Sequence, residues 1–203
     1  MSAATDDPRT VLHWYDFICP FCYIGQQRNA ILRRRGLVVV DLAFQAHPEI
    51  PFGGIQAGPR DGPMYATLER EAKEAGLPLR WPRHLPNTRK ALAAAEWVRR
   101  HRPVSATRFH RQLFQAHFAL AQDLEDQWVI DEHATESGID VAALHGALDD
   151  GSAARLVDET EVIGRGHGVY GTPAWFLNDQ LITGLRSAAD FEDIAEHALE
   201  VTG

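Results

Sequence analysis

How the first part of the chain folds is decided by one stretch, Val11-Leu12-His13-Trp14-Tyr15-Asp16-Phe17-Ile18-Cys19-Pro20-Phe21-Cys22. Its opening, from Val11 to Phe17, is mostly apolar and aromatic, which predicts a buried strand. Pro20 suits the first position of a helix, because its fixed φ fits there and its missing N–H is not needed. The pattern predicts a strand that leads directly into a helix, with Cys19 as the residue that caps the helix.

This helix is expected to end at Gly36, after the basic run Arg33–Arg35. Glycine is the usual residue just past a helix, and arginines in the last turn face the negative end of the helix dipole. The next segment, Leu37–Phe44, is rich in β-branched residues and predicts a second strand. A strand, a helix and a strand in this order indicate a βαβ unit with two parallel strands.

Helical patterns fill most of the middle of the chain, after a Pro- and Gly-rich loop at His47–Pro63. The expected helices are Met64–Ala75, one capped by Asn87 or Thr88, one capped by Ser105, Glu125–Ser137, Asp140–Leu148 and Ser152–Arg165.

The last part of the chain changes character after a glycine-rich loop that begins at Gly164. Two short apolar segments, Ala174–Leu177 and Leu181–Thr183, predict a hairpin that turns at Asn178 and Asp179. The final helix has Ser187 as its cap and Asp190 as the acid of a capping box. The segment order is therefore βαβ, a helical block and ββα.

Composition excludes several classes of partner. The chain has 203 residues and a net charge of -8, so a nucleic-acid backbone is an unfavourable ligand. No apolar run approaches the length of a membrane span. The opening stretch, Met1–Thr10, has neither the basic region nor the apolar region of a signal peptide. We expect a cytoplasmic protein with no nucleic-acid or membrane partner.

The two cysteines of the chain, Cys19 and Cys22, form a C-x-x-C pair at the predicted helix start. Thiol–disulfide exchange needs one thiolate that attacks and a second sulfur that resolves the mixed disulfide. Cys19 is the expected nucleophile, because free N–H groups at a helix start stabilise an anionic sulfur, and Cys22 is expected to resolve. A zinc site within one chain is not expected, since no second C-x-x-C pair exists and no histidine follows at zinc-finger spacing. A dimeric zinc-bridged module, with one pair from each chain, is the non-enzymatic alternative.

Three further features are candidate parts of the site. Thr172–Pro173 is expected to be a cis peptide bond, and Gly171 before it indicates a loop that approaches another segment closely. Asp16, at the end of the first strand, is a candidate for proton transfer to or from the sulfurs. Phe21 and Tyr23 are candidates for an apolar rim.

The residues Tyr15–Gly25, the helix start Asn87–Leu92 and the loop Gly168–Pro173 together resemble the DsbA-like thioredoxin proteins, especially the FrnE-like branch. The resemblance implies an α/β, thioredoxin-like fold in which a mixed four-stranded sheet, ordered 4-3-1-2, carries a large all-helical insertion. It implies a thioredoxin-like domain at residues 8–62 and 166–203 and the insertion at residues 63–165.

The resemblance also implies roles for the loops. Pro173 matches the cis-proline that packs against the C-x-x-C, and Pro20, Phe21, Gly171 and Thr172 are the expected substrate-binding residues. The implied activity is that of a protein disulfide oxidoreductase or isomerase. Its substrate would be a disulfide- or thiol-containing protein, or glutathione. DsbA has a histidine where this chain has Phe21, so we expect a Cys19 pKa above that of DsbA and a weaker oxidant.

No cofactor is expected to be required, although glutathione is a candidate redox partner or cosubstrate, and a homodimer is left open. The alternative enzyme is a glutathione-dependent isomerase or transferase, because 2-hydroxychromene-2-carboxylate isomerases and kappa-class glutathione transferases resemble the same architecture. Those relatives usually carry serine at the position of Cys19. The presence of both Cys19 and Cys22 favours redox exchange.

Overall fold

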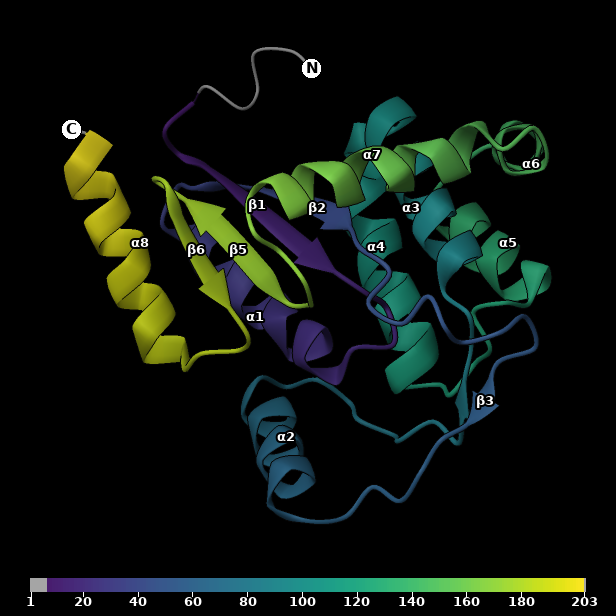
Figure 1. Ribbon diagram of the computed structural model, residues 1–203, viewed down its shortest axis with the longest axis horizontal. Coiled ribbons are helices and arrows are strands. Elements are labelled where there is room, and N and C mark those ends of the chain that lie inside the picture. The colour runs from purple at the N-terminus through teal and green to yellow at the C-terminus, as the bar shows by residue number, and fades with distance from the viewer. Residues whose placement is uncertain (1–6, 203) are drawn as a thin grey trace.

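The computed structural model describes residues 7–202, so most of the opening stretch Met1–Thr10 lies outside the described residues. Its centre is a four-stranded sheet in the order β2-β1-β5-β6 (Figure 1). The strands are β1 (Thr10–Tyr15), β2 (Val38–Ala43), β5 (Ala174–Leu177) and β6 (Gln180–Thr183). β1 runs parallel to β2 and antiparallel to β5, and β5 runs antiparallel to β6. Numbered along the chain, this is the predicted 4-3-1-2 order, and the thioredoxin-like fold is confirmed.

Side chains on the two faces of the sheet pack against different helices. On one face, Val11 and Trp175 lie in a cluster with residues of α1 (Pro20–Arg34) and α8 (Ala188–Thr202). On the other face, Leu12 and Trp14 pack with Leu42 and with side chains near the end of α7 (Ser152–Gly166). This alternation follows from the two-residue period of β1, and it makes the sheet the middle layer of the molecule.

The hairpin and the last helix form as the sequence predicted. Asn178 and Asp179 have φ values of 48° and 59°, which is the positive-φ geometry of a two-residue hairpin turn. At the start of α8, the Ser187 N–H donates to the Asp190 carboxylate and the Asp190 N–H donates to the Ser187 hydroxyl. This reciprocal pair is the predicted capping box.

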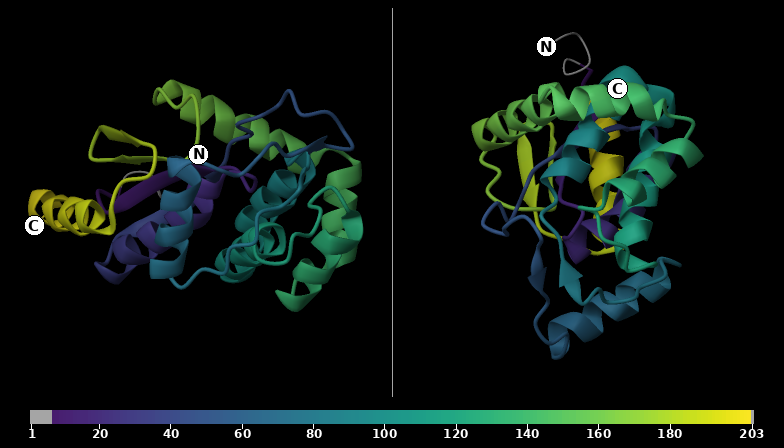
Figure 2. Two further views of the ribbon diagram at one scale, coloured as in Figure 1. Left: turned by 90° about the horizontal axis from the view of Figure 1, so that it is seen from below. Right: turned by 90° about the vertical axis from the view of Figure 1, so that its right-hand side faces the viewer.

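The middle of the chain is helical, as expected, with shifts of one to a few residues at most ends. Its helices are α2 (Pro63–Glu74), α3 (Arg89–His101), α4 (Pro103–Phe118), α5 (Gln127–Glu136), α6 (Val141–Asp149) and α7 (Ser152–Gly166). α2 and α7 lie at opposite ends of the molecule (Figure 2). None of the helices in the described residues is long and apolar enough to cross a bilayer.

One detail of the middle segment was predicted wrongly. Ser105 does not cap α4, because the helix already begins at Pro103, whose ring suits the first helical position. A short ladder was not predicted: Ile55–Gln56 (β3), inside the predicted loop, pairs with His84–Leu85 (β4). Strands of two residues leave no alternating pattern in sequence. The division into residues 8–62 with 166–203 and an insertion at 63–165 stays a prediction.

Candidate active site

The end of β1 and the start of α1 place the two cysteines. Cys19 is the N-cap of α1, with extended backbone angles and Pro20 at the first helical position. Its carbonyl accepts the N–H groups of Cys22 and Tyr23 at 3.0 and 3.1 Å. Both thiols are free, Cys19 partly exposed and Cys22 buried. The cap position therefore presents the Cys19 sulfur to solvent and keeps the Cys22 sulfur behind it.

The loop before β5 lies against this helix start. The Thr172–Pro173 peptide bond is cis, and the Cys19 Sγ–H donates to the Thr172 carbonyl at 3.4 Å, although the two residues are 153 apart in sequence. The Gly184 N–H donates to the Pro173 carbonyl at 2.9 Å and ties the loop to β6. The loop therefore approaches another segment closely, as predicted, but the contact is made at Thr172, and a Cβ on Gly171 would meet nothing within 4 Å.

The surroundings favour the thiolate at Cys19 and the thiol at Cys22. A hydrogen bond from the Cys22 thiol lowers the pKa of Cys19 below its ordinary value. The Cys22 N–H and the Thr172 side chain lower the Cys19 pKa further, whereas burial and Asp16 oppose them. Burial raises the pKa of Cys22 well above its ordinary value, and donation to Cys19 adds to that rise. The pair is therefore split into a nucleophile and a sulfur that stays protonated.

Asp16 is fully buried directly before the cysteine turn. Its carboxylate accepts the Ala46 N–H at 2.8 Å and the Ile18 N–H at 3.4 Å, and burial raises its pKa. Asp16 is close enough to raise the pKa of Cys19. A buried acid with a raised pKa beside two sulfurs is placed for proton transfer, which remains a prediction.

A cavity of about 580 Å³ opens beside Cys19. The residues that line it come from the helix start, the loop after β2, the β3 and β4 segments and the cis-proline loop: Ile18, Cys19, Pro20, Phe21, Ala46, His47, Glu49, Ile50, Ile55, Arg60, Leu85, Tyr170, Gly171 and Thr172. The four predicted substrate-binding residues all line this cavity, namely Pro20, Phe21, Gly171 and Thr172.

The predicted apolar rim is only half right. Phe21 lines the cavity, whereas Tyr23 is fully buried and donates its hydroxyl to the Pro78 carbonyl at 2.7 Å. The difference follows from the helix, since residues two apart on a helix point to different sides.

Several residues of this cavity were not predicted as site residues. His47 and Glu49 form an ion pair of 2.8 Å, and Arg60 enters from the loop before α2. Tyr170 is largely exposed beside the cis-proline loop. The Pro- and Gly-rich composition of His47–Pro63 indicated a loop, but nothing in that composition says where the loop lies in space.

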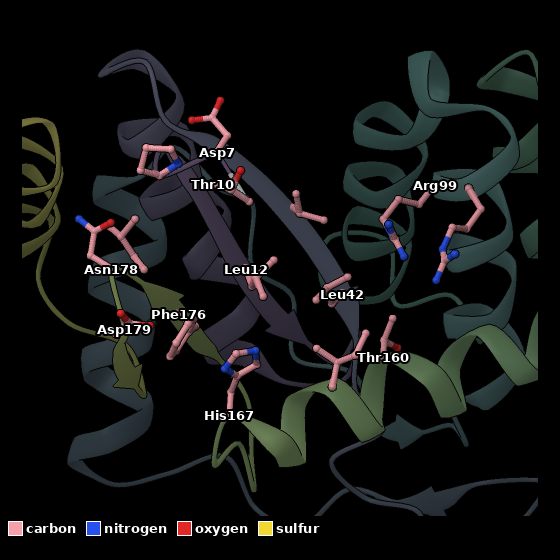
Figure 3. Close-up of a pocket in the computed structure, with 15 residues that line it drawn as sticks. Asp7, Thr10, Leu12, Leu42, Arg99, Thr160, His167, Phe176, Asn178 and Asp179 are labelled. Atoms are coloured by element: carbon pink, nitrogen blue, oxygen red, sulfur yellow. The ribbon is translucent and has the colours of Figure 1, made fainter. Parts of the chain in front are cut away.

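A second cavity, of about 610 Å³, lies on the face of the sheet that packs against α7 (Figure 3). Leu12, Leu42 and Phe176 form its apolar floor, and Arg99 and His167 lie at its sides. Neither cysteine lines it. Among the described residues, no group of three or more His, Cys, Asp or Glu side chains is arranged to hold a metal ion.

Comparison with known proteins identifies the family of this chain. The DSBA-like thioredoxin domain matches residues 10–196. The chain belongs to this family. It is 24% identical over 187 residues to 2-hydroxychromene-2-carboxylate isomerase from Sphingobium xenophagum, a match that covers 87% of this chain and 92% of that protein. The predicted resemblance to DsbA-like proteins and to these isomerases is confirmed.

Solved structures of this DsbA-like chain's relatives share its fold. A probable DsbA oxidoreductase from Streptomyces coelicolor superposes with a TM-score of 0.78 at 21% identity, covering 94% of this chain and 90% of that one. The cytosolic disulfide reductase DsbM from Pseudomonas aeruginosa, solved with GSH, superposes with a TM-score of 0.67 at 18% identity, covering 94% and 99%. Proteins described as a DsbA oxidoreductase, a disulfide reductase and an isomerase thus share this fold.

Proposed function

We propose that this DsbA-like protein is a thiol–disulfide oxidoreductase in which Cys19 attacks and Cys22 resolves. The observation that carries the proposal is the pairing of a partly exposed Cys19, whose pKa is lowered, with a buried Cys22, whose pKa is raised. The Cys19 thiolate attacks a substrate disulfide, forms a mixed disulfide and releases one substrate thiolate. Cys22 then attacks the Cys19 sulfur, which closes the Cys19–Cys22 disulfide and releases the second thiolate.

The second step needs a base, because Cys22 holds its proton tightly. Asp16 is the candidate acceptor, since its carboxyl is buried and burial raises its pKa. The substrate disulfide would lie in the cavity beside Cys19, against Phe21 and Thr172. The proposed substrates are disulfide- or thiol-containing proteins or glutathione, and the reaction requires no bound cofactor.

Reduction of insulin by dithiothreitol or glutathione, followed with and without the protein, tests this function. Catalysis appears as faster insulin reduction in the presence of the wild type and not of Cys19→Ser. Equal rates with and without the wild-type protein, under both reductants, would exclude the proposal.

A glutathione-dependent isomerase is the second candidate, favoured by the match to 2-hydroxychromene-2-carboxylate isomerase along most of both chains. Such an isomerisation involves no net oxidation, so it would not need Cys22 as a resolving sulfur. Incubation with 2-hydroxychromene-2-carboxylate and glutathione separates the two candidates. An isomerase would keep its activity in Cys22→Ser, whereas a disulfide oxidoreductase would lose multiple turnover in that variant.

A zinc bridge between two chains fits the geometry poorly, because the side chain of Cys22 has 0% exposure and would have to leave the core to reach a shared ion. Metal analysis of the purified protein tests this alternative, and about one zinc per two chains would support it. The cytoplasmic location and the homodimer stay predictions, which cell fractionation and light scattering can check.

A further inference from the structure

Within residues 7–202, one charged group of the cavity beside Cys19 has no ionic partner. Glu49 pairs with His47, so the carboxylate of the cavity is already engaged. Arg60 lines the same cavity, and no carboxylate among the described residues lies within ion-pair distance of it. The guanidinium is therefore the unpaired charge of the cavity that holds the nucleophile.

Aromatic rings hold this guanidinium in place. Arg60 lies 5.6 Å from the centre of the Tyr65 ring and 5.6 Å from that of Trp81. Its Nη1 donates to the Tyr65 hydroxyl at 3.2 Å, and the Trp81 indole N–H donates to Glu69 at 2.7 Å, which fixes the second ring. The arginine is thus ordered before any ligand arrives, and a ligand would lose little by ordering it.

This arrangement leaves most of the guanidinium's hydrogen-bonding capacity unused. Arginine has five N–H donors, and in the described residues Arg60 uses one of its terminal nitrogens, for Tyr65. Its Nε is shielded from solvent and has no partner there. Charged donors that are half-buried and unpaired destabilise a fold. Stacking on two rings offsets part of that cost and does not supply an anion.

The aromatic clamp of Arg60 is joined to the cysteine turn. Phe21, which lies between the two cysteines, packs on the same apolar cluster as Tyr65 and Trp81, over Ile24. The groups that lower the Cys19 pKa are Cys22 and Thr172, so the thiolate already has its stabilisers. The cation is therefore available to a group that enters the cavity with the substrate.

We propose that Arg60 is a specificity-determining residue that binds a carboxylate of the substrate, so that the site prefers disulfides whose sulfur-bearing groups are acidic. This rests on the oxidoreductase function proposed above. A guanidinium offers two parallel N–H donors to a carboxylate, which gives both attraction and orientation. A substrate anchored at Arg60 would present its disulfide to Cys19 across the cavity.

A pair of matched substrates tests the preference. The disulfide of 3-mercaptopropionate carries two carboxylates, and the disulfide of 3-mercaptopropionamide is its neutral near-isostere. Each is mixed with pre-reduced protein, and the second-order rate of Cys19–Cys22 disulfide formation is followed by quenched mass spectrometry. Per event, two protein thiols are oxidised and two substrate thiols are released.

For the wild type, we expect the acidic disulfide to react faster than the neutral one by about tenfold, which corresponds to about 1.4 kcal/mol, the size of one charged hydrogen-bond contact. Arg60→Gln should abolish that ratio by slowing the acidic substrate alone. Arg60→Lys, which keeps the charge without the fork, should give an intermediate ratio. Arg108→Gln, which removes an exposed arginine of α4, is the matched control and should keep the wild-type ratio.

The neutral substrate makes each outcome decisive. If Arg60→Gln leaves the ratio of the two rates unchanged, or slows both substrates equally, Arg60 does not bind a carboxylate of the substrate and the proposal is overturned. If the wild-type protein reacts with neither disulfide, the oxidoreductase function itself fails, which is a different result. An equal loss of ratio in Arg108→Gln would show a general effect of net charge and would also overturn the proposal.

Discussion

The two cavities of this protein are similar in size and differ in chemistry. The cavity beside Cys19 measures about 580 Å³. It is lined by a cysteine with a lowered pKa, by the cis-proline loop and by an unpaired arginine. The cavity on the α7 face measures about 610 Å³ and has an apolar floor of sheet side chains (Figure 3). Their volumes do not distinguish the two cavities, so the reactive groups that line a cavity identify the candidate active site.

The difference has a structural origin. The lining of the α7-face cavity includes a row of paired strand residues, Val40, Leu12 and Phe176, whose positions are fixed by the register of β2, β1 and β5. The cavity beside Cys19 is built where a strand ends, a helix begins and separate loops meet. Loops at the end of a sheet can bring functional side chains from distant segments together, whereas the face of a sheet presents only the side chains of its own strands.

The largest expected effect is the loss of disulfide turnover when a cysteine beside the first cavity is replaced. Replacing the nucleophile, Cys19→Ser, should lower disulfide turnover by at least about a thousandfold, because a serine hydroxyl cannot attack a disulfide at neutral pH. Cys22→Ser should instead allow the first step and stop the second. Insulin reduction measures both variants, and substantial turnover by Cys19→Ser would assign the chemistry to another group.

A change beside the α7-face cavity should affect stability and leave the chemistry intact. A Cβ at Gly164 would lie 2.8 Å from Trp14 Nε1, whose N–H donates to the Thr160 carbonyl. Gly164→Ala should therefore destabilise the protein by about 1 to 3 kcal/mol, since α7 must shift away from the sheet. Urea unfolding measures the loss of stability, and Gly166→Ala, where a Cβ would meet nothing, is the matched control.

Thr172 offers a finer test of the cavity beside Cys19. Its hydroxyl is buried, and a hydrogen bond from this side chain lowers the pKa of both sulfurs. Thr172→Val keeps the shape and removes the hydroxyl, so the pKa of Cys19 should rise. Because the thiolate is the reactive form, alkylation at slightly acidic pH should then slow severalfold, with the same plateau rate at high pH. Identical pH profiles would show that the hydroxyl does not stabilise the thiolate.

The smallest expected effect compares one substitution in both places. Ile55 lines the cavity beside Cys19 and Ile163 lines the cavity on the α7 face. Ile55→Phe should lower kcat/KM for insulin by about threefold, because the larger side chain narrows the cavity for a large substrate. A change in the packing of one side chain has an effect of about this size. Ile163→Phe should leave kcat/KM within about twofold. A larger effect from Ile163→Phe would connect the second cavity to catalysis.

Local signals in the sequence were sufficient for the parts of the fold that depend on neighbouring residues. Cys19 and Pro20 marked the helix start, and Asn178 with Asp179 marked the turn, because cap and turn geometries involve only a few adjacent residues. The order of segments and the resemblance then gave the sheet order. The predicted helix cap at Ser105 was wrong because Pro103, two residues earlier, is the stronger signal for a helix start.

Parts of the site that depend on distant segments could not be predicted from spacing. Arg60 and Glu49 lie in a loop without periodicity, and only the folded chain places them beside Cys19. The prediction that Tyr23 lies at the rim is wrong, because the turn of the helix buries its side chain. The close approach predicted for the loop of Gly171 occurs at Thr172, and the structure leaves room for a side chain at Gly171 itself.

The central claim is that Cys19 is the sulfur that attacks. Its most direct test is to mix pre-reduced Cys22→Ser with a disulfide substrate, quench with acid within seconds and locate the adduct by peptide mass spectrometry. We predict one substrate thiol bound per chain, on Cys19, that persists because no resolving sulfur remains. No adduct on Cys19 in Cys22→Ser, together with an adduct on Cys22 in Cys19→Ser, would contradict the account and reverse the two roles.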